Sequence, residues 1–213
     1  ILENLYAKPA KTFLVSTSWE IDQDSFFPAK QLNLPEKFSL LKNPVSQKAR
    51  IFIPADLVNI GGFRYQNYLA EKIVKLHETN GITLAVFPTQ SQLLTCYEKI
   101  RQDNLLNDSE LLALNMPYNF WQLMQKIKEE KTGIYLIPLY QLWSLKPFSI
   151  LKKAILLKIP FSSPSNPILQ VRGQSYESSF DDYTLPLTIL QTQKTIACLL
   201  ALFRARHDVV LLL

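Results

Sequence analysis

The sequence predicts an α/β domain built on a central, mostly parallel β-sheet that is flanked by helices. Short apolar runs of strand length alternate along the chain with segments whose apolar residues recur at helical spacing. One such run, residues 82–87 (ITLAVF), has no polar alternation, which is typical of a strand buried on both faces. Hydrophobic residues make up 47% of the 213-residue chain and charged residues 19%, a composition typical of a globular domain with a real core.

Apolar periodicity and turn signals locate the individual elements. The predicted strands are residues 12–16, 37–41, 50–53, 82–87, 111–114, 134–137, 154–157 and 208–213. A helix is predicted from Tyr65 to Leu76, and Gly81 ends it. Further helices are predicted around residues 93–100, 120–127 and 187–203, the first of them capped by a polar residue among 89–91.

Three loops follow the carboxyl ends of predicted strands. They are residues 88–90, 138–143 and 158–167. The last loop contains three prolines and three serines between Pro160 and Pro167, so we expect no regular structure there. Because parallel sheets bind their ligands beyond the carboxyl ends of the strands, functional residues are expected in these loops.

The charge of the chain permits an anionic partner without requiring one. The formal net charge is +5 and the pI is about 9.1. Nucleic acid or a membrane surface would suit such a charge. The basic residues are scattered, however, and solvated lysines explain the charge equally well.

Cysteine and histidine are too sparse for a metal site. The chain has two of each, Cys96, Cys198, His77 and His207, and none is spaced like a metal ligand. Both cysteines lie among apolar residues, so we expect buried thiols in a reducing cytoplasm. The longest apolar run, residues 195–203, is shorter than the roughly 18 residues of a membrane span, and we expect no membrane. The chain begins with Ile1, so we expect it to be part of a longer protein.

The common motifs of catalysis are missing from the sequence. Neither a G-x-x-x-x-G-K-[ST] phosphate loop nor a G-x-S-x-G nucleophile motif occurs, and the five glycines form no phosphate cradle. The pair Asp181 and Asp182 is better explained as a solvated loop than as an acid–base or metal site, because adjacent carboxylates point in different directions. Composition and spacing alone therefore indicate an α/β domain without recognisable catalytic residues.

Four segments, taken in order, resemble one known family. They are residues 14–18 (LVSTS), 85–91 (AVFPTQS), 157–168 (LKIPFSSPSNPI) and 182–190 (DYTLPLTIL). Their order and spacing resemble the C-terminal part of the DinG/XPD-type (Rad3-related) superfamily-two DNA helicases. The resemblance extends from about Lys11 to Leu213 and is greatest for the Gram-positive DinG-like proteins, in which a helicase module often follows an exonuclease module.

The resemblance implies a RecA-like fold and a division of the chain. Residues 1–43 would carry the end of a first motor domain and a crossing segment, and residues 44–213 would be the second, C-terminal motor domain. The family uses ATP and magnesium, but the phosphate loop belongs to the first motor domain. We therefore expect no cofactor and no catalysis in this segment alone, and the first motor domain of the same chain as its partner.

The same alignment puts uncharged residues where the family has catalytic arginines. The family motif Gln-x-x-Gly-Arg-x-x-Arg aligns with residues 194–201 (KTIACLLA), so Cys198 and Ala201 stand at the two arginine positions. Loss of one such arginine typically lowers the rate of phosphoryl transfer by about a thousandfold or more. The preceding family motif has decayed too, because residues 137–145 (IPLYQLWSL) keep only its tryptophan, Trp143.

Polar residues remain where the family contacts the phosphate backbone of nucleic acid. The resemblance implies this role for Thr89 and Gln90, and Lys158 ends the next strand. Trp143 offers a stacking surface, although we expect a buried tryptophan. Three hypotheses remain: a degenerate helicase domain that binds single-stranded DNA or RNA, an interaction scaffold without nucleic acid, or a working helicase that takes its arginine from Arg204 or Arg206.

The first prediction concerns ATP. We expect the chain neither to hydrolyse ATP nor to bind it tightly, because it has no phosphate loop and has Cys198 and Ala201 at the arginine positions. Isothermal titration calorimetry with ATP and magnesium measures this directly. Micromolar affinity would contradict the prediction.

Overall fold

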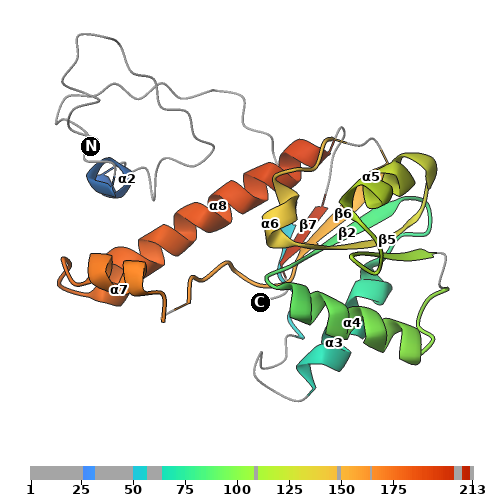
Figure 1. Cartoon of the computed structure of the whole chain (residues 1–213), viewed down its shortest axis with the longest axis horizontal. Helices are drawn as coiled ribbons and strands as arrows, with labels where there is room; N and C mark the ends of the chain where they lie inside the picture. The colour runs from blue at the N-terminus through green and yellow to red at the C-terminus, as the bar shows by residue number, and fades with distance from the viewer. Residues whose placement is uncertain are drawn as a thin grey trace, which may run out of the picture. The chain divides into compact units, whose positions relative to one another are not determined.

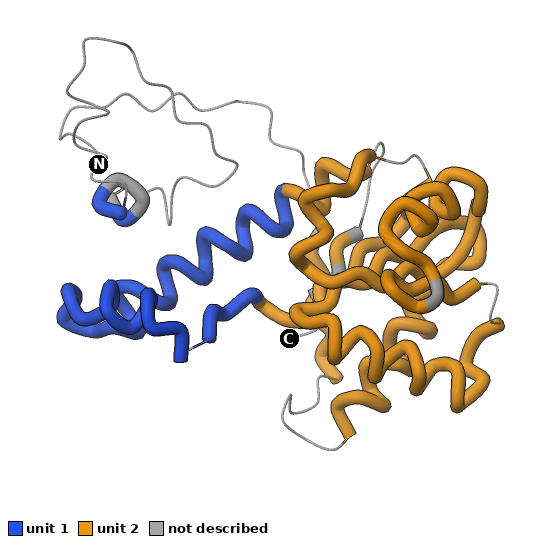
Figure 2. The backbone as a smooth tube through the Cα atoms, in the orientation of Figure 1, with its two compact units in different colours: residues 1–47, 160–197 blue, residues 48–159, 198–213 orange. Residues whose placement is uncertain are grey.

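The computed structural model describes residues 26–31, 50–56, 64–107, 110–147, 150–163, 165–203 and 208–211 (Figure 1). Its elements, in chain order, are α2 (Phe26–Gln31), β1 (Arg50–Phe52), α3 (Tyr65–Leu76), β2 (Ile82–Phe87), α4 (Gln90–Gln102), β3 (Leu111–Leu114), β4 (Pro117–Tyr118), α5 (Phe120–Glu129), β5 (Gly133–Pro138), α6 (Leu139–Leu142), β6 (Leu151–Leu156), α7 (Pro167–Gly173), the π-helix η2 (Ser179–Thr184), α8 (Leu185–Leu202) and β7 (Asp208–Leu211). They form two compact units, residues 1–47 with 160–197 and residues 48–159 with 198–213 (Figure 2).

The second unit is built on a parallel sheet. Among the described residues, seven strands form this sheet in the order β1-β7-β6-β2-β5-β3-β4. Strand β2 pairs along its whole length with β5, from Ile82↔Gly133 to Phe87↔Pro138, and pairs with β6 on its other side. All the pairings are parallel, which confirms the sheet that the apolar runs predict.

Helices cover both faces of the sheet, as predicted (Figure 1). Every residue of β2, β3 and β5 is buried. Along β2, Ala85 and Phe87 face the cluster formed with α3 and α4, whereas Leu84 and Val86 face the cluster formed with α5, α6 and the last turns of α8. Alternate side chains of one strand thus serve two separate cores.

Side-chain caps determine where two of the helices begin. The Thr89 hydroxyl accepts a hydrogen bond from the Gln92 N–H at 3.3 Å and caps α4, as predicted. Asn119 and Gln122 form a capping box at the start of α5, with two reciprocal hydrogen bonds of 3.0 Å.

The structure corrects several predicted boundaries. Helix α6 occupies the middle of the predicted loop at residues 138–143. Helix α7 begins at Pro167, a position that suits proline because N–H groups in the first turn of a helix have no partner within the helix. Strand β6 begins at Leu151 rather than Ala154, and α8 begins at Leu185 rather than Leu187. The strands predicted at residues 12–16 and 37–41 lie outside the described residues, as does the predicted domain boundary at residues 43–44.

The predicted solvated loop at Asp181 and Asp182 is helical instead. Both residues lie in η2, where each carboxylate accepts a hydrogen bond from Ser178. Asp181 accepts from the Ser178 hydroxyl at 2.7 Å, and Asp182 accepts from the Ser178 N–H at 2.9 Å. The two carboxylates therefore stabilise the start of a helical turn, where anions are favourable.

The first unit contains a cluster of aromatic residues around Tyr176. The Gln31 amide donates to the Tyr176 hydroxyl at 2.6 Å, and the Lys30 ammonium lies 4.1 Å from the centroid of the Tyr176 ring. The ring of Tyr183 lies 5.3 Å from that of Tyr176 and 6.3 Å from that of Phe27. These contacts join α2 to residues far along the chain, which no local pattern in the sequence indicates.

One helical stretch is long and apolar enough to cross a membrane by composition. This stretch, Ser179–Leu202, reaches a mean hydropathy of 1.3 over 18 residues, of which 22% are buried. A single such helix is weak evidence for a membrane span. The last turns of α8 pack into the core of the second unit through Leu199 and Leu202.

The central position of β2 generates a stability prediction. Leu84 and Leu156 are 0% and 2% exposed, so Leu84→Asp or Leu156→Asp would bury an unpaired carboxylate and cost several kcal/mol of unfolding free energy. Urea unfolding followed by circular dichroism measures the loss. Ile168→Asp, at a residue that is 63% exposed, is the control and should stay near the wild type. Cooperative unfolding of the Leu84→Asp variant at wild-type urea concentrations would show that β2 is wrongly placed.

Candidate nucleic-acid interface

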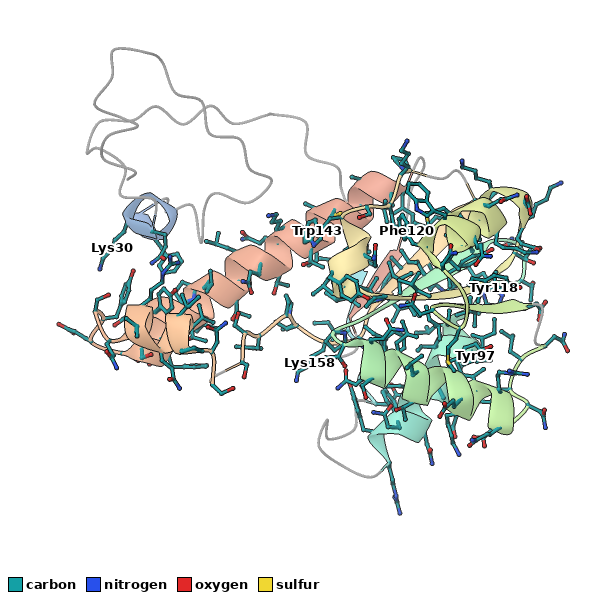
Figure 3. The ribbon with its side chains drawn as sticks, in the orientation of Figure 1. Lys30, Tyr97, Tyr118, Phe120, Trp143 and Lys158 are labelled. Carbon is teal, nitrogen blue, oxygen red and sulfur yellow. The ribbon has the colours of Figure 1, made fainter. Side chains whose placement is uncertain are left out.

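The predicted site residues gather at one edge of the sheet, at the carboxyl ends of β6, β2 and β5. These three strands are neighbours, and strands of a sheet lie about 4.8 Å apart. Lys158 follows β6, Thr89 and Gln90 follow β2, and Trp143 ends α6, which follows β5 directly (Figure 3). The strand ends therefore bring Lys158, Thr89 and Gln90 to the same edge, and Trp143 lies at the far end of the short helix that begins there.

Thr89 is exposed and occupies the N-cap of a 13-residue helix. Its hydroxyl oxygen accepts from the Gln92 N–H, which leaves the hydroxyl hydrogen available for donation. The first-turn N–H groups of α4 point toward the same edge and carry the positive end of the helix dipole. This arrangement suits a phosphate oxygen, and the predicted contact stays a prediction.

Gln90 has a second, structural role that its sequence position does not reveal. Its side-chain amide donates to the Leu114 carbonyl at 3.0 Å, which joins the start of α4 to the end of β3. The amide oxygen is buried and has no hydrogen-bond partner among the described residues. The amide group of Gln90 therefore makes its contacts within the protein rather than with solvent.

Lys158 is half-buried, and the residue before it forms hydrogen bonds through both its N–H and its carbonyl. The Leu157 N–H donates to the Val86 carbonyl at 3.1 Å, and the Leu157 carbonyl accepts from the Tyr65 hydroxyl at 3.1 Å. In the described part of the chain, no carboxylate forms an ion pair with Lys158. The backbone next to Lys158 is thus fixed by hydrogen bonds, and no carboxylate of the described residues neutralises its charge.

Tyr65 is a positioning residue that the sequence pattern assigns only to the core. Its ring is buried against α4 and the sheet, and burial raises the pKa of its hydroxyl above the usual value for tyrosine. The proton therefore stays on the oxygen and continues to be donated to Leu157. Because the two residues are 92 positions apart, no local signal could reveal the contact.

Two aromatic side chains, one in α6 and one at its C-cap, are exposed. Trp143 is 47% exposed, so the expectation of a buried tryptophan is wrong. Tyr140, three residues earlier and 57% exposed, was missed as a candidate. Leu142 anchors α6 in the core, which leaves the two rings on the outer side. The sequence did carry a signal for both rings, because two aromatic residues stand three positions apart in a loop that follows a predicted strand.

The two positions that the resemblance aligns with the arginines of the family hold side chains without charge. Cys198 is half-buried and its thiol lies 3.9 Å from the Leu142 carbonyl, where it is a weak donor. Ala201 is exposed on the next turn of α8. Arg204 and Arg206, the proposed substitutes, lie outside the described residues.

The ranges that the structure describes contain no metal site, and the Cys96 thiol is unreactive. No group of three His, Cys, Asp or Glu side chains lies close enough to hold a metal ion in those ranges. Burial raises the pKa of the Cys96 thiol to about 12, so this cysteine stays protonated and unreactive near neutral pH.

Comparison with known proteins identifies the fold. No protein-family model matches the sequence, and no curated protein matches it. Among solved structures, an XPD helicase matches with a TM-score of 0.61 at 12% identity, over 88% of this chain and 36% of that one. The Xpd4 protein of S. tokodaii matches with a TM-score of 0.54 at 14% identity, over 84% of this chain and 38% of that one.

These likenesses confirm the predicted fold class. The chain is a RecA-like α/β domain with the fold of XPD helicases, and it spans little more than a third of the length of either matched protein. The narrower resemblance to DinG-like proteins stays a prediction.

The Tyr65 hydrogen bond generates a prediction about this edge. Tyr65→Phe removes the hydroxyl and leaves the Leu157 carbonyl buried without its partner, which should cost about 1–3 kcal/mol of unfolding free energy. Urea unfolding measures the change. Tyr140→Phe is the matched control, because it removes an exposed hydroxyl and should change little. Equal stability of the two variants would show that Tyr65 does not hold the Lys158 segment.

Proposed function

We propose that this chain is the second motor domain of a DinG-like helicase in a degenerate form, which binds single-stranded nucleic acid without supporting ATP hydrolysis. The proposal is supported by one observation above all. The carboxyl edge of a helicase-like sheet carries Lys158, the capped start of α4 and two exposed aromatic rings, while Cys198 and Ala201 offer no cation to a nucleotide phosphate.

The chemistry of this edge suits a nucleic-acid strand of any sequence. Thr89 and the first turn of α4 would bind a phosphate, and Lys158 would neutralise a neighbouring one. Tyr140 and Trp143 would stack bases without reading their edges. Binding should therefore be weak and indifferent to sequence. With so few cations, log affinity should fall against log salt with a slope on the order of one to three.

In the longer protein, ATP and magnesium would be bound by a first motor domain of the same chain. The domain proposed here, residues 44–213, would then serve that motor, or a nuclease elsewhere in the protein, by holding the strand. A working helicase with Arg204 or Arg206 in the arginine role is the competing proposal. An intact G-K-[ST] loop in the first motor domain would support that rival.

A scaffold function has one observation in its favour. Ile168 and Val171 on α7 and Phe180 on η2 are 63%, 67% and 55% exposed. Ile168 and Val171 are three residues apart and so lie on one face of α7, and contiguous exposed apolar side chains are typical of protein-interaction sites. Under this alternative, the chain would bind a protein partner and no nucleic acid.

The nucleic-acid proposal is tested by fluorescence anisotropy with a labelled single-stranded oligonucleotide at low and moderate salt. Lys158→Ala should lower the salt slope by about one. Trp143→Ala should weaken binding about tenfold, since one stacked base contributes about 1–3 kcal/mol.

Thr89 provides a matched pair of variants. Thr89→Ser keeps both the helix cap and the hydroxyl, and should bind like the wild type. Thr89→Asp also caps the helix but places a negative charge beside the phosphate, and should bind less tightly. No binding at low salt, or binding unchanged in the combined Lys158→Ala and Thr89→Ala variant, would favour the scaffold.

A further inference from the structure

The carboxyl edge of the sheet continues past the candidate interface to the start of α5. Strand β5 pairs in parallel with β3, and β3 with β4, so their carboxyl ends share one edge with those of β6 and β2. Strand β4 ends at Tyr118 and α5 begins at Phe120, which puts the first turn of α5 at this edge. Strand β4 is the fourth strand from β6, so the two strand ends are roughly 19 Å apart at the usual spacing.

The first turn of α5 presents a supported indole ring. Trp121 is 78% exposed, the largest fraction among the exposed large apolar side chains that the structure describes. Phe120 beside it packs against the same core cluster as Leu139 at the start of α6, which places both helices on one face of the sheet. The rings of Phe120 (labelled in Figure 3) and Trp121 meet edge to face, with their centroids 5.7 Å apart. The anchored phenylalanine therefore supports a tryptophan that solvent largely surrounds.

The segments that follow these strands contain basic residues and no acidic ones. They are residues 157–163 after β6, 88–97 after β2, 139–147 after β5 and 115–125 after β3, and their charged residues are Lys146 and Lys158. The first turns of α4 and α5 begin at the same edge and also contain no acidic residue. The positive ends of both helix dipoles are therefore not neutralised by a carboxylate of their own helix.

The opposite edge of the same sheet carries the acidic residues. Glu78 precedes β2, Glu110 precedes β3 and Glu130 precedes β5, so all three stand at the amino ends of parallel strands. Glu78 pairs with Lys153 at 3.0 Å and Glu130 pairs with Lys126 at 3.3 Å. The two edges of the sheet therefore differ in charge, and a polyanion is attracted to the carboxyl edge rather than to the amino edge.

We propose that Trp121 stacks on a base at the far end of the path of a single strand, which crosses the carboxyl edge from Lys158 to α5. This inference rests on the proposed function and extends it to a residue and a length. An exposed, supported indole on a surface without carboxylates suits a base of any kind, because every base has a face that stacks. A stacked strand advances about 3.4 Å per nucleotide, so the path takes about six nucleotides.

Strand length tests this path, by fluorescence anisotropy at low salt. Trp121→Ala should weaken binding of a twelve-nucleotide deoxyadenylate strand about tenfold, because one stacked base is lost. The same variant should bind a four-nucleotide strand like the wild type, measured by competition, because four stacked nucleotides cover roughly 14 Å and do not reach from Lys158 to α5. Trp121→Phe keeps a ring and should stay near the wild type. Phe180→Ala removes an exposed ring of η2 and should change neither affinity.

Gln122 provides a variant that adds charge to the path without disturbing the fold. Its side-chain oxygen accepts from the Asn119 N–H at 3.0 Å in the capping box, and a glutamate accepts the same hydrogen bond. Gln122→Glu should therefore keep the stability of α5 and weaken binding of the twelve-nucleotide strand several-fold at low salt, and less at moderate salt. Gln102→Glu adds the same charge in the last turn of α4, away from the carboxyl edge, and should leave binding unchanged.

The outcomes separate this inference from the proposed function. Equal binding of the long strand by the wild type and Trp121→Ala, with binding still dependent on Lys158, would overturn the role of Trp121 alone. An equal loss for the short and the long strand in Trp121→Ala would overturn the path from Lys158 to α5. Absence of strand binding by the wild type would overturn the proposed function, and this inference with it. Polyglutamate that competes as strongly as the long strand would assign the edge to an acidic protein, because it carries charge without bases.

Discussion

The structure of the second unit depends on the burial of β2 on both faces at the centre of a parallel sheet. Its backbone pairs with β5 and β6, so its polar groups are satisfied within the sheet. Its side chains alternate between two cores, with Ala85 and Phe87 in one and Leu84 and Val86 in the other. Because the strand is covered by both cores, helices must lie on both faces, and the carboxyl ends of the parallel strands must share one edge.

This dependence explains why the fold does not require charged side chains at residues 198 and 201. The core rests on strand burial and on helix residues such as Leu199 and Leu202, none of which carries charge. Cys198 lies against the Leu142 carbonyl, and Ala201 is exposed, so neither position needs an arginine to maintain packing.

The carboxyl edge illustrates how the scaffold brings polar groups together. At the edge, Thr89 and Lys158 follow neighbouring strands, so their proximity is a direct result of sheet order. Gln90 supports this edge from within the protein, because its amide joins the start of α4 to the end of β3.

The sequence alone determined the elements whose apolar periodicity is strong, such as β2 and the stripe of α4, and the Thr89 cap, because these signals are local. It missed α6, α7 and η2, which are short and lie among prolines or polar residues. Tertiary structure decided the rest. The Tyr65–Leu157 and Gln90–Leu114 hydrogen bonds join residues that are distant in the chain, and the exposure of Trp143 depends on how α6 packs on the core. Periodicity encodes which face of an element is apolar, but only packing selects the partner that this face meets.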